Sequence, residues 1–67
     1  MKTKINVGDL VSSRAHIAQT KHGKMLISEP TIGVVISNNG GSGYYDIVLN
    51  TGKIIRTAYA NLEVVNA

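Results

Sequence analysis

The feature that most constrains this chain is its short length combined with the absence of cysteine. A chain of 67 residues has room for one hydrophobic core and buries only about 60% of its unfolded surface on folding. No disulfide or thiolate metal site can compensate for a small core, because cysteine is absent. The apolar side chains must therefore be packed efficiently, or part of the surface must be covered by another chain.

The residues available for this core favour β structure. The sequence contains no Phe or Trp, and Tyr44, Tyr45 and Tyr59 are its only aromatic residues. The core must therefore be built mainly from Val, Ile, Leu and Ala. Because Val and Ile are branched at Cβ, they suit the pleated surface of a sheet. We expect an all-β chain.

Apolar alternation and turn residues divide the chain into short strands. A long hairpin is expected over residues 16–28, with its turn at Lys21-His22-Gly23-Lys24, and Pro30 ends it because proline has no N–H. The Gly- and Asn-rich residues 38–43 predict an exposed turn, and Asn50-Thr51-Gly52 predicts a tight one. The other expected strands are 7–11, 32–36, 44–49, 53–57 and 62–65.

Two of these strands carry more detailed predictions. The nearly continuous apolar run 32–36 is typical of a strand covered on both faces, which predicts the centre of the sheet. Gly33 within it permits a bend or a close approach of backbone. In the following strand, Tyr45, Ile47 and Leu49 alternate with polar or smaller positions, so they are expected to face the core.

Five short strands, a long first loop and a single 3₁₀ turn at residues 58–61 resemble the SH3-like barrels, including the Tudor-like and KOW-like modules. The resemblance implies one five-stranded barrel over residues 6–66, preceded by a short tail of residues 1–5. It is carried by short segments across most of the chain: 7–11, 32–36, 45–52 and 60–63.

A weaker similarity connects the chain with the plasmid-borne type II dihydrofolate reductases. It consists of the opening Gly8-Asp9-Leu10-Val11 and the ending Ala60-Asn61-Leu62-Glu63. That family is a tetrameric enzyme with a Val-Gln-Ile-Tyr run in its pore. The matching stretch here is Ile54-Ile55-Arg56-Thr57, without the glutamine or the tyrosine. The substitution argues against the same chemistry, and an oligomeric reductase-like enzyme remains the least favoured alternative.

Tudor-like modules that read methylated side chains surround a cation with several aromatic rings. Only three tyrosines are present here, and the alternation assigns Tyr45 to the core. An aromatic cage is therefore not expected.

Charge gives the leading functional hypothesis. The net charge of +3 modestly favours polyanionic partners, and lysine and arginine side chains neutralise nucleic-acid phosphates. We therefore expect a non-catalytic module that binds DNA or RNA, with a tyrosine available to stack on an unpaired base. The candidate nucleic-acid-binding residues are Arg14, Lys21, His22, Lys24, Tyr44, Lys53, Arg56 and Tyr59.

The alternative is a protein-interaction or self-assembly role. Met25, Leu26 and Ile27 form an apolar run on the expected protruding hairpin. Such side chains either cover the end of the barrel or meet a protein partner or a second copy. The sequence leaves both outcomes open.

Other classes have less support in the sequence. His16 and His22 are expected as exposed imidazoles on the hairpin, and two such ligands without cysteine do not make a zinc site. No framed nucleophile or paired carboxylate predicts catalysis in a single chain. We expect no metal, cofactor or membrane partner, and a soluble, cytoplasmic protein.

Overall fold

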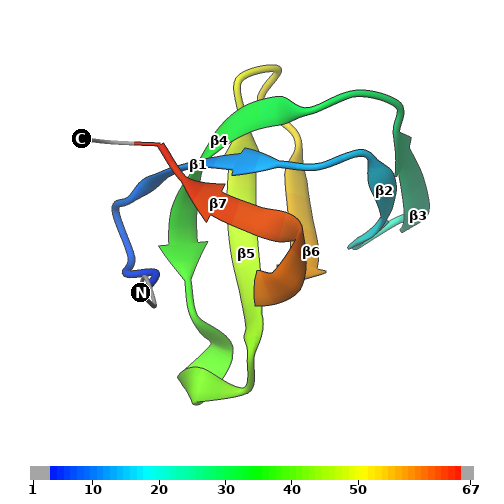
Figure 1. The fold of residues 1–67 in the computed structure, drawn as a ribbon. Coiled ribbons are helices and arrows are strands. Elements are labelled where there is room, and N and C mark those ends of the chain that lie inside the picture. The colour runs from blue at the N-terminus through cyan, green and yellow to red at the C-terminus, as the bar shows by residue number, and fades with distance from the viewer. Residues whose placement is uncertain (1–3, 66–67) are drawn as a thin grey trace.

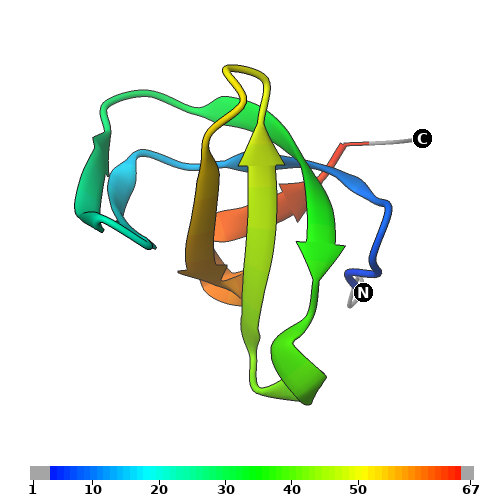
Figure 2. The same ribbon diagram turned by 180° about the vertical axis from the view of Figure 1, so that it is seen from behind.

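Seven strands form one antiparallel sheet in the computed structural model, which describes residues 4–65. The strand order is β3-β2-β6-β5-β4-β1-β7, and two short 3₁₀ turns, η1 and η2, lie between strands (Figures 1 and 2). The predicted all-β class is confirmed. The expected tail at 1–5 and the expected barrel end at 66 lie partly outside the described residues. The elements are β1 Leu10–Ser13, β2 His16–Thr20, β3 Gly23–Ile27, β4 Thr31–Ser37, η1 Asn39–Gly41, β5 Tyr44–Leu49, β6 Ile54–Ala58, η2 Tyr59–Asn61 and β7 Leu62–Val64.

The sheet differs from the expected five-stranded barrel in strand number and closure. The hairpin forms as predicted, but its two strands belong to the sheet, because β2 pairs with β6 through Gln19 and Arg56. Only Arg14 and Ala15 separate β1 from β2, yet β1 pairs with β4 and β2 with β6. Between β1 and β2 the chain therefore crosses from the β4 side of the sheet to the β6 side (Figure 1). With β3 and β7 as edges, backbone pairing leaves the sheet open.

The first strand lies further along the chain than predicted. Asn6 and Asp9 close a turn in which the Asn6 N–H donates to the Asp9 carboxylate at 2.8 Å. Gly8 within this turn has φ +98°, a conformation that glycine adopts without strain. The predicted strand 7–11 is therefore wrong at its start, and Val7 is exposed instead of packed. In β1 the buried positions are Val11 and Ser13.

The apolar strand β4 is neither central nor covered on both faces, so both predictions are wrong. β5 occupies the middle of the seven strands. Along β4, Gly33 and Val35 are buried, whereas Ile32, Val34 and Ile36 are exposed on the other face. A strand that is covered on both faces and a strand that is covered on one face, with aliphatic side chains exposed on the other, can have the same continuous apolar run. The sequence pattern alone therefore does not distinguish the two.

The core lies inside the curve of the sheet and is aliphatic. Its buried members are Val11, Ala18, Ile27, Val35, Ile47, Leu49 and Ile55. Tyr45 packs against this cluster, so the predicted alternation of Tyr45, Ile47 and Leu49 toward the core is confirmed. Gly33 also fulfils its prediction, because a Cβ there would lie 2.8 Å from the Val48 carbonyl oxygen on β5. Only glycine allows β4 to approach β5 this closely.

Candidate functional site

The tip of the hairpin and the turn between β5 and β6 form the two sides of one open cleft. Lys21, His22 and Lys24 contribute from the hairpin, and Lys53 contributes from the turn. The cleft has a volume of about 510 Å³. Four of the eight nucleic-acid-binding residues expected from the sequence therefore lie together.

A hydrogen-bonded turn holds the hairpin tip in place. The Thr20 hydroxyl donates to the Gly23 carbonyl oxygen at 2.7 Å and accepts from the His22 N–H at 3.1 Å. Gly23 has φ +118°, which allows the chain to reverse between β2 and β3. Thr20 was not singled out from the sequence, although a threonine immediately before a Gly-containing turn is a recognised signal for such a local hydrogen bond.

The opposite side of the cleft is the predicted tight turn. The Gly52 N–H donates to the Leu49 carbonyl at 2.8 Å, and the Leu49 N–H donates to the Lys53 carbonyl at 2.7 Å. Gly52 has φ +93°, so the predicted left-handed glycine is confirmed. These bonds fix the backbone of Lys53 directly after the turn, beside the hairpin tip.

The cleft is positive because its cations have no acidic neighbour in it. Among the described residues that line it, none is Asp or Glu. Lys21, His22, Lys24 and Lys53 are all exposed. Like charges gathered at one concave surface raise the local positive potential and attract anions from solution. An oxyanion entering the cleft meets several nitrogen donors at once.

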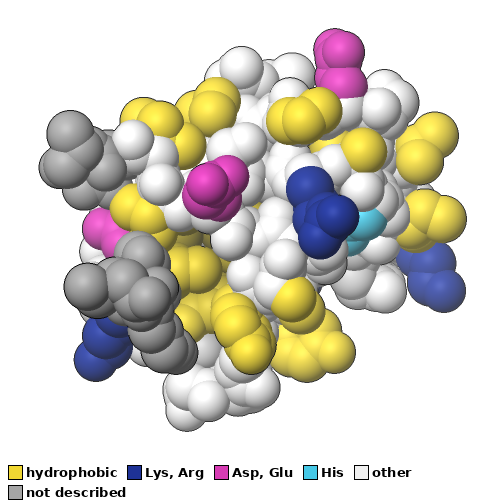
Figure 3. Space-filling model, in the orientation of Figure 1, with side chains coloured by type: hydrophobic (Ala, Val, Ile, Leu, Met, Phe, Trp, Pro, Cys, Tyr) yellow, Lys and Arg dark blue, Asp and Glu magenta, His cyan; other side chains and the backbone are white. Residues whose placement is uncertain are grey.

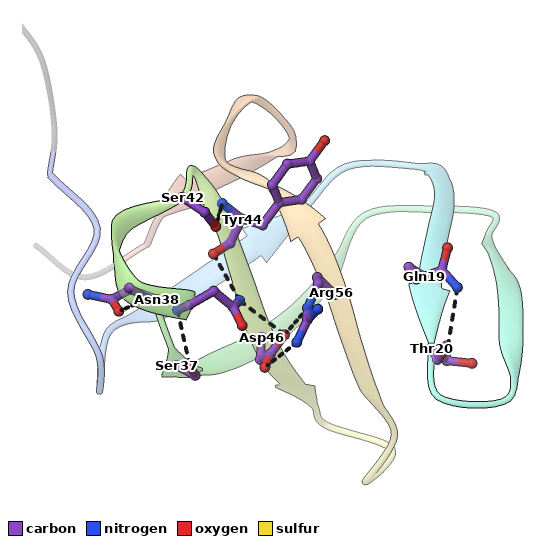
Figure 4. A network of polar contacts seen from close by, with 10 residues as sticks. Gln19, Thr20, Ser37, Asn38, Ser42, Tyr44, Asp46 and Arg56 are labelled. Atoms are coloured by element: carbon purple, nitrogen blue, oxygen red, sulfur yellow. Dashed lines mark hydrogen bonds and ion pairs between the residues drawn. The ribbon is translucent and has the colours of Figure 1, made fainter.

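Arg56 lies in an adjoining hollow of about 300 Å³, where it is paired with an acid. Its Nε donates to Asp46 Oδ1 at 2.9 Å, from β6 to the neighbouring β5 (Figure 4). The Asn39 amide from η1 also donates to Asp46, at 3.4 Å. Arg56 is therefore neutralised locally and contributes little free charge to the cleft.

The same pairing shifts the titration of both partners. The hydrogen bond from Arg56 is the largest cause that lowers the pKa of the Asp46 carboxyl, with burial opposing it and Asn39 assisting. The pKa of Arg56 is raised in turn by Asp46. Because Arg56 is largely exposed, solvent and salt weaken this interaction.

Acid titration tests the Asp46–Arg56 pair. A carboxyl whose pKa is lower in the folded chain than in the unfolded chain stabilises the fold at pH values above its unfolded pKa of about 4. This stabilisation is lost as the pH falls through the pKa of the folded chain. Asp46→Asn and Arg56→Gln should each lower the free energy of unfolding near neutral pH. The difference from the wild type should shrink as the pH falls below the unfolded pKa of the carboxyl, because Asp46 then becomes protonated and loses its interaction with Arg56. Urea titrations at several pH values measure it, and differences that do not vary with pH would contradict the assignment.

The structure places the other predicted nucleic-acid residues elsewhere. Arg14 lines a separate hollow of about 410 Å³ together with Glu63. Tyr44 begins β5 and Tyr59 begins η2, so they lie at the end of β5 opposite the Lys53 turn. On the face that carries β1 and β7, the Lys and Arg side chains are separated by uncharged surface (Figure 3). The eight candidates thus do not form one continuous surface.

His16 is half-buried instead of exposed, which corrects the sequence prediction. Its Nδ1 lies 2.7 Å from the Arg14 carbonyl, an acceptor, so Nδ1 carries the proton and donates. Its Nε2 then accepts from the hydroxyl of buried Thr57 at 2.7 Å, and the Asn61 amide donates to the same hydroxyl. This network joins β2, β6 and η2. Within residues 4–65 no three His, Asp or Glu side chains form a metal-binding group.

The predicted protein-interaction residues divide between two environments. Ile27 is buried in the core and Met25 packs against it. Leu26, which lies between them, points to the outer face and is 69% exposed. Strand alternation explains the division, because successive side chains of β3 face opposite sides of the sheet.

Comparison with known protein families, curated proteins and solved structures finds no match to this chain. In the described part of the chain, no helix has the length and apolar character needed to cross a membrane.

Proposed function

We propose that this chain is a small non-catalytic module that binds the phosphate backbone of nucleic acid in the cleft between the hairpin tip and the Lys53 turn. The observation that carries the proposal is the convergence of Lys21, His22, Lys24 and Lys53 from two distant parts of the sequence on one concave surface. Neutralising phosphates with lysine releases condensed counterions, which drives association.

An SH3-like architecture is part of this proposal. Strand order β7-β1-β4-β5-β6, the long hairpin between β1 and β4, and the turn η2 directly before β7 support it. Loops positioned by a rigid scaffold often carry binding residues. The cleft lies between two of them, the hairpin tip and the turn that joins β5 to β6.

The composition of the cleft favours contacts to phosphate over contacts to bases. Lysine acts as a point charge for phosphate, and no tyrosine is among the described residues that line the cleft. Tyr44 and Tyr59, the expected stacking residues, lie at the other end of β5. Binding should therefore depend little on sequence and should accept both DNA and RNA.

Salt titration tests the proposal. With three lysines on phosphates, the logarithm of affinity should fall with the logarithm of salt concentration with a slope of about −2 to −3. A fourfold rise in salt then weakens binding about 30-fold. Fluorescence anisotropy with labelled single- and double-stranded oligonucleotides of unrelated sequences measures this slope. Absence of binding at low salt, or binding indifferent to salt, would reject the proposed function.

A further inference from the structure

The hollow beside Arg56 shares part of its wall with the basic cleft. Thr20, Lys21 and Ile54 line both of them. The hollow has a volume of about 300 Å³. Figure 4 shows Gln19 and Thr20 on β2 at one side and Arg56 on β6 at the other. A ligand that is held in the cleft can therefore extend into this hollow.

Ile54 gives the shared wall an apolar surface. It is 52% exposed, whereas the next residue, Ile55, is buried in the core. The pairing of β6 with β5 holds Ile54 opposite Val48, so the backbone that carries this side chain has a fixed position. Lys21 and Lys53 line the cleft together with Ile54. A ligand that covers this region needs an apolar part directly beside its anionic part.

Arg56 offers a flat surface to the hollow. Its Nε donates to Asp46 Oδ1 at 2.9 Å, and its Nη2 donates to Asp46 Oδ2 at 3.5 Å. The Asn39 amide donates to the same carboxylate. The N–H groups that bond Asp46 lie in the plane of the guanidinium group, so these bonds do not cover its faces. The Arg56 side chain is 54% exposed. Guanidinium planes of this kind stack on unpaired nucleic-acid bases.

Gln19 supplies a polar group on the opposite strand. It is the register partner of Arg56, and both residues are exposed. The Gln19 amide donates to the Thr20 carbonyl at 3.4 Å, a long bond that it can exchange for one to a ligand. Because a carboxamide has both a donor and an acceptor, it can bond the edge of different bases.

We propose that this hollow receives one unpaired base of the strand whose phosphates occupy the cleft. The inference rests on the proposed function and narrows its substrate class to single-stranded DNA or RNA. The base lies against Ile54 and one face of Arg56, with its edge toward Gln19. Arg56 then contributes a stacking surface instead of free charge. Since every base has such a face, the contact is tolerant of sequence.

The surroundings of the hollow favour an unpaired base over the two other ligands that the cleft could hold. In a duplex the bases are stacked and paired, so none can enter the hollow unless it is flipped out of the stack, which costs free energy. A polyanion without rings would fill the cleft but leave Ile54 and the face of Arg56 in water. Only a single strand places an apolar ring next to each phosphate.

A strand without bases tests the inference. Fluorescence anisotropy compares a labelled strand of about ten nucleotides, within the usual site size, with an abasic strand of the same length. Both carry the same phosphates. The ordinary strand should bind about tenfold more tightly, as expected for one base contact, and the two salt slopes should agree. Equal, salt-dependent affinities would overturn the base site and leave the phosphate cleft standing. Absence of binding by both strands would reject the proposed function, and the base site with it.

Two variants locate the contact. Ile54→Ser removes the apolar wall, and Arg56→Lys removes the flat surface but keeps the charge. Each should weaken binding of the ordinary strand about fivefold and leave the abasic strand and a duplex unchanged. Ile36→Ser is the matched control, because Ile36 is 44% exposed on β4 and lines neither hollow nor cleft. Circular dichroism checks that each variant keeps its strand content. Equal losses for all three ligands, or an equal loss in the control, would overturn the assignment.

Discussion

Replacing Gly33 with alanine should destabilise this fold by about 3 kcal/mol, the upper part of the range for forcing extra volume into a packed core. The added Cβ would lie 2.5 Å from Cγ2 of Ile47 and 2.8 Å from the Val48 carbonyl oxygen. Ile47 is fully buried, and the Val48 backbone belongs to the β4–β5 ladder. Neither group can move without separating the two strands. A domain of this size has about 3–10 kcal/mol of total stability, so much of it would be lost.

Urea unfolding followed by circular dichroism measures the effect of Gly33→Ala. Gly40→Ala is the matched control, because a Cβ at Gly40 meets nothing within 4 Å although the residue has φ +69°. The control should cost about 1 kcal/mol, from backbone strain alone. If Gly33→Ala were no more destabilising than Gly40→Ala, the close approach of β4 and β5 would not be a packing constraint.

The double variant Lys21→Glu, Lys53→Glu should weaken oligonucleotide binding about 100-fold or more at low salt. It changes one cation on each side of the cleft and leaves Lys24 in place. Loss of two charge-assisted contacts at about 1.5–3 kcal/mol each accounts for the size of the effect. The salt slope should fall to about −1, since one lysine remains on phosphate.

The control for this variant carries the same change in net charge. Lys4→Glu with Arg14→Glu also replaces two cations with two acids, but neither residue lines the cleft. It should weaken binding only a fewfold, through the long-range potential. Equal losses in the two double variants would show that binding follows overall charge and has no site. Both variants should unfold at urea concentrations close to the wild-type value, because all four side chains are exposed.

Local sequence signals predicted those parts of the fold that depend on near neighbours. Glycine at turn positions predicted the hairpin turn at Gly23 and the tight turn at Gly52. The two-residue repeat of side chains along a strand predicted that Ile47 and Leu49 face the core. The start of the first strand was not predicted correctly. Val7 and Val11 have the spacing expected of a strand, but in the structure Gly8 lies in a turn that Asn6 and Asp9 close. The burial of Ser13 was missed, since a serine gives no apolar signal.

The candidate site was predicted in its residue types and only partly in its arrangement. Lys21 and Lys24 are close in sequence, so their proximity followed from the hairpin. Lys53 joins them only because β2 crosses beside β6, a non-local pairing that no short motif encodes. Arg56 was counted as a free cation, and its partner Asp46 was hidden because cross-strand pairing depends on the register of β5 and β6.

The pairing of β1 with β7 also sets the order in which this fold can assemble. β4, β5 and β6 follow one another along the chain and form an antiparallel meander from local contacts. By contrast, Val11 pairs with Val64, so almost the whole described chain must be ordered between them. Closing such a long loop has a large entropic cost before any contact is gained, and topologies of this kind fold in milliseconds to seconds. On a ribosome, β1 would emerge early and wait, with one edge unpaired, until β7 has been synthesised.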